Sequence, residues 1–180
     1  KDGYKFRGGS DTEVALGAIE QYGFVEALNR LVGMYAIGLW DREERALFLA
    51  RDRLGEKPLY YGTIGRFFAF ASDLNAMRQI PGWGNEVDRT AVALLMQHFY
   101  VPAPKTIYRG IKKMLPGGWI KVDSENCFRE PTVNKYWSVS DLITQESQKA
   151  QNIDVEESIR RLDSLLRNTI RNKLISDVPL

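Results

Sequence analysis

Cysteine and histidine are scarce in this chain of 180 residues, which contains one of each. The single cysteine, Cys127, excludes an intrachain disulfide and a zinc site built from cysteines, and it suits a reducing compartment. The single histidine, His98, excludes a His-rich metal site. We therefore expect no metal ligands in this chain, and we interpret Cys127 and His98 as bystanders rather than catalytic groups.

The chain also lacks an excess of one charge and a long apolar run. The 25 Lys and Arg residues against 23 Asp and Glu residues leave a formal net charge of +2, which is too small a field to hold nucleic acid or an anionic membrane. No apolar stretch approaches the roughly 18 residues that a membrane-spanning helix needs. We expect a cytoplasmic protein that binds neither nucleic acid nor a membrane.

The composition is that of an ordinary globular protein, with 44% apolar and 27% charged residues. The sequence opens without a methionine and stops soon after Ser176-Asp177-Val178-Pro179, at the start of a new apolar segment. We therefore expect the chain to be part of a longer protein.

A helix-capping pattern stands at the start of the first amphipathic segment. Ser10 followed three residues later by Glu13 forms a capping box, whose side chains satisfy free N–H groups at a helix start. Apolar residues continue at helical spacing to Leu28, so the pattern predicts a helix that begins near Asp11. Gly23 costs a helix about 1 kcal/mol relative to alanine and is expected to divide it in two.

Short apolar runs then predict four strands, at residues 34–40, 46–50, 59–61 and 67–71. Their connections at 41–45 and 62–66 are polar or contain glycine, which favours hairpins and antiparallel pairing. Both faces of each strand are apolar, so we expect a second sheet against one face and helices against the other. The aromatic residues of these strands are expected to be core: Trp40, Phe48, Phe67, Phe68 and Phe70.

The rest of the chain divides into helix, strand and linker patterns. Asp88 is a cap for a helix over about 89–99, and residues 119–122 are a strand candidate. Residues 139–153 are polar and show no apolar periodicity, so we interpret them as a linker. After Asp154 an amphipathic helix is predicted, with acidic residues at its start and basic residues at its end.

Familiar catalytic motifs are absent from the sequence. It contains no Gly-x-Gly-x-x-Gly, no Gly-x-x-x-x-Gly-Lys loop and no His-Glu-x-x-His. Cys127 stands in a polar, loop-like context and forms no recognisable pair with the one histidine. These residues by themselves indicate a layered α/β chain and no particular reaction.

Several short strings nevertheless follow one another in a characteristic order over almost the whole chain. They are Gly9-Ser10-Asp11-Thr12-Glu13-Val14, Gly33-Met34-Tyr35-Ala36 with Trp40-Asp41, Arg51-Asp52-Arg53-Leu54-Gly55-Glu56-Lys57-Pro58-Leu59-Tyr60-Tyr61, Phe70-Ala71-Ser72, Tyr100-Val101-Pro102-Ala103-Pro104, Leu115-Pro116-Gly117, Tyr136-Trp137 and Ser176-Asp177-Val178-Pro179. Each string is weak alone. The ordered set resembles the glutamine-hydrolysing asparagine synthetase family, whose members are class II, N-terminal-nucleophile glutamine amidotransferases.

The resemblance implies an α/β fold built as a four-layer α/β/β/α sandwich of the N-terminal-nucleophile hydrolase type, incomplete at its N-terminus. It assigns residues 1–138 to the later part of the glutaminase domain, 139–153 to a linker, and 154–180 to the start of an α/β ATP-pyrophosphatase-type synthetase domain. In the family the nucleophile is an N-terminal cysteine, which we expect upstream of Lys1, and the pyrophosphate loop is expected after Leu180. No catalytic residue is therefore expected within this chain.

The activity that the resemblance implies has two halves. Glutamine is hydrolysed through a cysteine thioester, and the ammonia reacts with an aspartyl adenylate made from ATP and aspartate with Mg²⁺. Glutamine, aspartate and ATP are the expected partners. ATP and Mg²⁺ are expected to be required by the parent protein but not to be bound by this fragment. Because members of the family form dimers, a homodimer is also possible. Two alternatives remain: an amidotransferase for another carboxylate, as in surface-polysaccharide assembly, or an inert fragment that serves as an interaction module.

The resemblance assigns glutamine binding to the first string. Asp11 matches the acidic residue that binds the α-ammonium group of glutamine, a task that suits an ionised acceptor, although it could also only complement the helix dipole. Gly9 and Ser10 are candidates to line the same pocket or to serve only in the turn and cap. Arg51 and Asp52 are expected to form a structural ion pair, or, as the resemblance implies, to belong to a loop that lies towards the other domain and helps to shape the ammonia path. We assign Lys57 no ligand.

Overall fold

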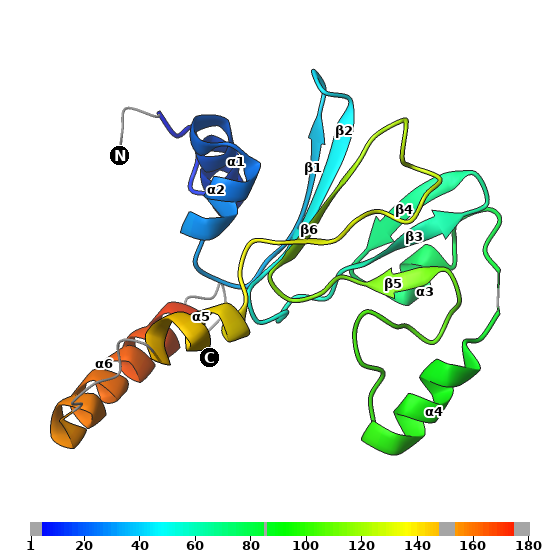
Figure 1. The fold of residues 1–180 in the computed structure, drawn as a ribbon. Coiled ribbons are helices and arrows are strands. Elements are labelled where there is room, and N and C mark those ends of the chain that lie inside the picture. The colour runs from blue at the N-terminus through cyan, green and yellow to red at the C-terminus, as the bar shows by residue number, and fades with distance from the viewer. Residues whose placement is uncertain (1–4, 85, 148–153, 175–180) are drawn as a thin grey trace. The chain divides into compact units, whose positions relative to one another are not determined.

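The computed structural model describes residues 5–84, 86–147 and 154–174, and the chain forms two compact units, 1–138 and 139–180 (Figure 1). The elements of the first unit are α1 (Asp11–Tyr22), α2 (Phe24–Arg30), β1 (Ala36–Asp41), β2 (Ala46–Arg51), β3 (Tyr60–Ile64), β4 (Phe67–Ala71), α3 (Leu74–Met77), α4 (Arg89–His98), β5 (Ile111–Lys113), β6 (Gly118–Val122) and β7 (Asn134–Lys135). The second unit contains α5 (Val139–Ser147) and α6 (Val155–Lys173).

Two antiparallel sheets form the centre of the first unit. One has the strand order β1-β2-β6-β7 and the other the order β4-β3-β5. The two predicted hairpins are present, because β1 pairs with β2 and β3 with β4, both antiparallel. The second hairpin is tighter than expected, since β3 continues to Ile64 and leaves only Gly65 and Arg66 for the turn.

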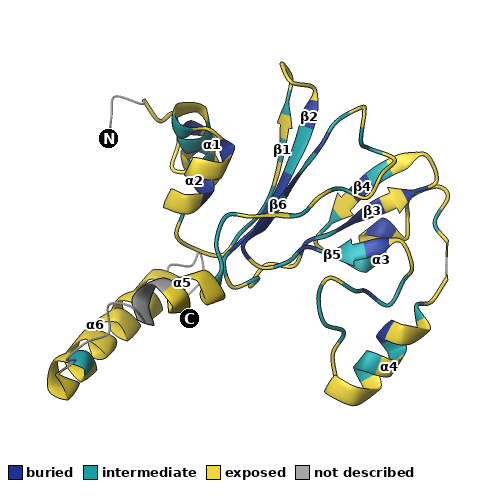
Figure 2. Ribbon diagram, viewed as in Figure 1, coloured by how far each residue is buried: buried dark blue, intermediate teal, exposed yellow. Residues whose placement is uncertain are grey.

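Three apolar clusters arrange these sheets and helices in layers. The central cluster joins Leu49 of β2 and Ile120 of β6 to Tyr61 of β3, so it lies between the two sheets. A second cluster packs α2, through Phe24 and Leu28, on the outer face of the first sheet, and a third places α3 against the other sheet. The layer order is therefore α/β/β/α, which confirms the predicted fold class (Figures 1 and 2).

The start of α1 follows from its capping residues. The Ser10 side chain caps α1 by accepting a hydrogen bond from the Thr12 amide at 3.2 Å, not from the Glu13 amide that a capping box uses. The Glu13 carboxylate does not return to Ser10 but accepts from the amides of Arg7 and Gly8, at 2.7 and 2.9 Å. The predicted reciprocal capping box is therefore not formed, and Glu13 instead fixes the segment that leads into the helix. Gly23, with φ +79°, separates α1 from α2 as expected.

Three of the five aromatic residues expected in the core are exposed. Trp40, Phe67 and Phe70 lie on β1 and β4, which are edge strands, and the prediction was wrong for them. Phe48 and Phe68 pack against the clusters as predicted. An aromatic residue on an edge strand lacks a neighbour on one side, so strand spacing alone does not decide its burial.

The second unit differs from the expected linker. Residues 139–147 form α5, in which Val139, Leu142 and Ile143 recur at helical spacing and the Thr144 hydroxyl donates to the Ser140 carbonyl at 2.9 Å. The remaining linker residues, 148–153, and the motif at 176–179 lie outside the described residues. The helix predicted after Asp154 is present as α6, and Asp154 caps it by accepting from the Glu156 amide at 3.0 Å.

Candidate functional site

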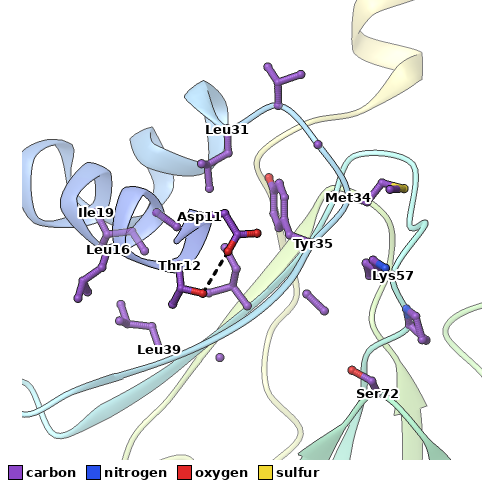
Figure 3. A pocket seen from close by; sticks show the side chains of 17 residues that line it. Asp11, Thr12, Leu16, Ile19, Leu31, Met34, Tyr35, Leu39, Lys57 and Ser72 are labelled. Atoms are coloured by element: carbon purple, nitrogen blue, oxygen red, sulfur yellow. Dashed lines mark hydrogen bonds between the residues drawn. The ribbon is translucent and has the colours of Figure 1, made fainter. Parts of the chain in front are cut away.

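A cleft of about 890 Å³ runs beside β1 in the first unit (Figure 3). Its walls come from the start of α1, the segment that leads into β1, the loop before β3 and the end of β4. The lining residues are Asp11, Thr12, Ala15, Leu16, Ile19, Leu31, Val32, Gly33, Met34, Tyr35, Ala36, Ile37, Gly38, Leu39, Lys57, Pro58 and Ser72. The lining is mostly apolar with a few polar groups, which is the usual composition of a small-molecule site.

Asp11 is the one member of the predicted glutamine-binding set whose side chain lines this cleft. It is the first residue of α1, it is exposed, and its carboxylate accepts a hydrogen bond from the Thr12 hydroxyl at 3.4 Å. Ser10 directs its hydroxyl to the helix cap, and Gly9 is exposed in the turn before it. The helix start holds the carboxylate of Asp11 where it both complements the helix dipole and faces the cleft.

Lys57 is a lining residue to which the sequence assigned no ligand. Together with Asp11 it makes up the charged side chains among the described lining residues. In Figure 3 Lys57 and Ser72 lie on the strand side of the cleft, and Asp11 and Thr12 on the helix side. The cleft therefore carries one negative and one positive side chain on different walls, an arrangement that sequence spacing did not reveal because 46 positions separate residues 11 and 57.

Arg51 and Asp52 hold the loop that carries Lys57. The Asp52 carboxylate, which is 1% exposed, accepts hydrogen bonds from the amides of Leu54, Glu56 and Lys57, at 3.2, 2.9 and 2.9 Å. The buried Arg51 guanidinium donates to carbonyls of the same loop and to the Met114 carbonyl. The two charged groups attract each other, but they form no direct salt bridge among the described residues. The guanidinium instead donates to backbone carbonyls and the carboxylate accepts from backbone amides.

A pair of tyrosines supports the cleft wall formed by the segment that leads into β1. The hydroxyl groups of Tyr35 and Tyr136 are 2.8 Å apart, and Tyr136 donates to the Arg51 carbonyl at 2.9 Å. Burial raises the pKa of both phenols above the ordinary value, so both remain neutral donors at physiological pH. The pair joins the start of β1 to the end of β2.

Cys127 and His98, which we interpreted as bystanders, do not line the cleft. Cys127 is partly buried in the turn that follows β6, where its thiol lies 3.6 Å from the Ser124 carbonyl, and His98 is the exposed last residue of α4. Among residues 5–84, 86–147 and 154–174, no cluster of three or more His, Cys, Asp or Glu side chains offers a metal site. No helix in this part of the chain is long and apolar enough to cross a membrane.

Comparison with known families identifies the first unit. The model of the glutamine amidotransferase domain matches residues 1–137, which is more than half of the chain. The chain belongs to the glutamine amidotransferase family. The amidotransferase unit is thus the one that contains the cleft, with Asp11 at its helical wall.

Curated relatives of this amidotransferase confirm the resemblance to glutamine-hydrolysing asparagine synthetases. The chain is 30% identical over 179 residues to asparagine synthetase [glutamine-hydrolyzing] 3 of Bacillus subtilis, covering 99% of this chain and 27% of that protein. It is 36% identical over 129 residues to asparagine synthetase [glutamine-hydrolyzing] 1 of the same organism, covering 71% and 20%. The chain therefore spans about a quarter of the length of these relatives.

A solved structure supports the fold of the amidotransferase. Glutamine phosphoribosylpyrophosphate amidotransferase of B. subtilis superposes with a TM-score of 0.52 at 20% identity, over 76% of this chain and 24% of that one. At this identity the likeness concerns the fold alone. It agrees with the α/β/β/α layers and with an N-terminal-nucleophile hydrolase type of architecture.

Proposed function

We propose that the parent protein of this chain is a glutamine-dependent asparagine synthetase. In this reaction glutamine and water give glutamate and ammonia, and ATP and aspartate give an aspartyl adenylate and pyrophosphate. Ammonia then displaces AMP from the adenylate to form asparagine. The observation that carries the proposal is the amidotransferase domain match over residues 1–137, joined to relatives named as glutamine-hydrolysing asparagine synthetases.

The proposed role of this chain is to form one side of the glutamine site. The Asp11 carboxylate is an ionised acceptor at the wall of the cleft, and it binds the α-ammonium group of glutamine in the proposal. Ser10 and Gly9 shape the turn that presents Asp11. The nucleophile is an N-terminal cysteine outside these 180 residues, and Cys127 takes no part because it does not line the cleft.

ATP and Mg²⁺ belong to the synthetase half of the proposal. We assign neither group to this part of the chain, because the resemblance places both in the synthetase domain. We propose that residues 139–153 lead from the glutaminase domain to a synthetase domain that begins at 154–180. The parent protein is proposed to be cytoplasmic, to act on glutamine, aspartate and ATP, and to form a homodimer.

The proposal is tested with the intact protein and a panel of carboxylate acceptors. Purified enzyme is given glutamine, ATP and Mg²⁺, and glutamate, AMP and the amide product are measured with aspartate or with sugar carboxylates. Asparagine formed with equal amounts of glutamate and AMP supports the proposal. An amide formed only from a sugar carboxylate indicates the alternative amidotransferase, and an intact protein that releases no glutamate indicates an interaction module.

A further inference from the structure

The loop between β2 and β3 is fixed by side chains that present no group to the cleft. The Asp52 carboxylate accepts three hydrogen bonds from amides of residues 54–57, and the Arg51 guanidinium donates three hydrogen bonds to carbonyls, two of which belong to the same loop. Gly55 lies over the guanidinium with φ +68°, and a Cβ there would come within 3.0 Å of the Arg51 Cζ atom. Such a dense set of buried, charge-assisted hydrogen bonds leaves the loop little conformational freedom.

The same two residues also anchor the opposite wall of the cleft. The Asp52 amide donates to the Tyr35 carbonyl at 2.9 Å, and the Arg51 carbonyl accepts from the Tyr136 hydroxyl, which contacts the Tyr35 hydroxyl. Tyr35 and Lys57 both line the cleft. The backbone at 51–52 therefore sets the spacing between the β1 wall and the loop wall.

We propose that Arg51 and Asp52 are positioning residues that act through Lys57, holding its side chain at the wall of the glutamine cleft. The inference rests on the proposed glutaminase activity. Neither residue lines the cleft, and both act by fixing the loop backbone from which the Lys57 side chain extends. Because a small misplacement of a binding group is costly even when its chemistry is unchanged, loosening the loop weakens glutamine binding. A contact made equally with substrate and transition state changes KM and leaves kcat nearly constant.

The test uses the intact enzyme with the variants Asp52→Asn, Lys57→Ala and the double variant. Asp52→Asn replaces an acceptor oxygen by an amide nitrogen, and Lys57→Ala removes an exposed side chain with the anchors in place. We expect each single variant to raise the KM for glutamine at least fivefold with kcat changed less than twofold. The double variant is expected to be no worse than the worse single variant, because residues that act as one unit are not additive.

Asp41→Asn is the matched control. Its carboxylate also organises a turn, accepting from the amides of Glu43 and Glu44 at 2.8 and 2.9 Å, but Asp41 does not line the cleft. We expect its KM for glutamine to equal that of the wild type. A variant Asp52→Asn that loses thermal stability but keeps its KM overturns the inference, as does full additivity of the two effects on KM.

Lys57→Ala keeps the test decisive if Asp52→Asn does not fold. Lys57 is exposed, so its removal leaves the fold intact, and an unchanged KM for glutamine in this variant overturns the inference. Failure of the proposed function is distinguished by the wild type, which then releases no glutamate at all. Synthesis with ammonium salts in place of glutamine is expected to be equal in every variant, because the change lies in the glutamine site.

Discussion

At the scale of single residues, the Asp11 carboxylate complements the dipole of α1 and has the proposed role of binding glutamine. Ser10 already provides the side-chain cap of α1, so Asp11 is not needed for capping. Its negative charge adds the favourable interaction with the helix dipole, which amounts to about 0.3–1 kcal/mol at an exposed position. The Asp11 side chain lines the cleft, which distinguishes it from the other acidic residues of α1 and is the basis for its proposed role in glutamine binding.

Replacing Asp11 by alanine is expected to weaken glutamine binding to the intact enzyme at least tenfold, which corresponds to about 1.4 kcal/mol. The loss follows from leaving the α-ammonium group of the ligand without its ionised acceptor. Glu20→Ala is the control, because Glu20 is an exposed acidic residue of the same helix that does not line the cleft. Isothermal titration with glutamine checks the effect, and equal affinities in the two variants contradict the assignment.

Tyr61 predicts a dependence of stability on alkaline pH. The residue is 2% exposed, and burial, with a smaller contribution from Glu130, raises the pKa of Tyr61 to about 12. Between pH 10 and 12 the unfolded state releases this proton while the folded state retains it, so stability falls as pH rises, by up to about 1.4 kcal/mol per pH unit. Below pH 10 both states hold the proton and the dependence vanishes.

The measurement is urea unfolding of the wild type and of Tyr61→Phe at several pH values. The difference between the two isolates Tyr61 from Lys113, whose pKa is lowered by burial and by Arg51 and which changes stability in the opposite direction. We expect the free energy of unfolding of Tyr61→Phe to decline less steeply above pH 10. Parallel curves for the two proteins over this range rule out the effect.

At the scale of elements, the turn that precedes β6 is determined by a glycine that approaches another segment closely. Gly117 has φ +63°, and a Cβ there would lie 2.4 Å from the Trp137 carbonyl oxygen. Its amide donates to the Asp52 carbonyl at 2.9 Å, so this turn also borders the positioning residues. Both the backbone conformation and the space require glycine here.

Gly117→Ala is expected to destabilise the protein by roughly 2–4 kcal/mol, the sum of a left-handed penalty and an overpacked contact. Gly84→Ala is the control, because nothing lies within 4 Å of a Cβ at Gly84 and its φ is not left-handed. Thermal unfolding of both variants gives the comparison. If Gly117→Ala is as stable as Gly84→Ala, the turn accommodates a Cβ atom without loss of stability and the requirement for glycine is contradicted.

The ends of helices could be predicted from the sequence where they are determined by neighbouring residues. The caps at Ser10, Asp88 and Asp154 and the break at Gly23 depend on neighbouring residues, and the structure shows each of them. Burial of Trp40 and Phe70 was not predictable, because it depends on which strands lie at the sheet edges. The helix at 139–147 was missed because its apolar residues are few and sit among polar ones.

At the scale of the whole molecule, the cleft is assembled from segments that are distant in sequence. Its walls come from residues 11–19, 31–39, 57–58 and 72, which meet only after the sheets pair and the helices pack on them. The sequence pointed to Asp11 through a resemblance, whereas Lys57 and Tyr35 were found to line the cleft only once the fold was known. Sequence spacing carries no information about contacts of this range.

The apolar face of α6 predicts that the stability of the intact protein depends on contacts between this helix and the synthetase domain. The apolar residues Ile159, Leu162, Leu166 and Ile170 of α6 are exposed in this chain. If α6 begins the synthetase domain, this face is buried in the intact protein, and Leu166→Asp is expected to lower its stability by about 2–4 kcal/mol through an unpaired buried charge. Asn168→Asp introduces the same residue on the same helix and is expected to change stability by less than about 0.5 kcal/mol. Chemical unfolding that gives equal losses for both contradicts the domain assignment.

The central claim is that the parent protein moves the amide nitrogen of glutamine to an activated carboxylate. The most direct measurement supplies glutamine labelled with ¹⁵N in the amide, together with aspartate, ATP, Mg²⁺ and excess unlabelled ammonium, and follows the label in the product. We predict ¹⁵N in the side-chain amide of asparagine, and loss of that label in Asp11→Ala while synthesis from ammonium continues. Asparagine that carries only unlabelled nitrogen in the wild type contradicts the account.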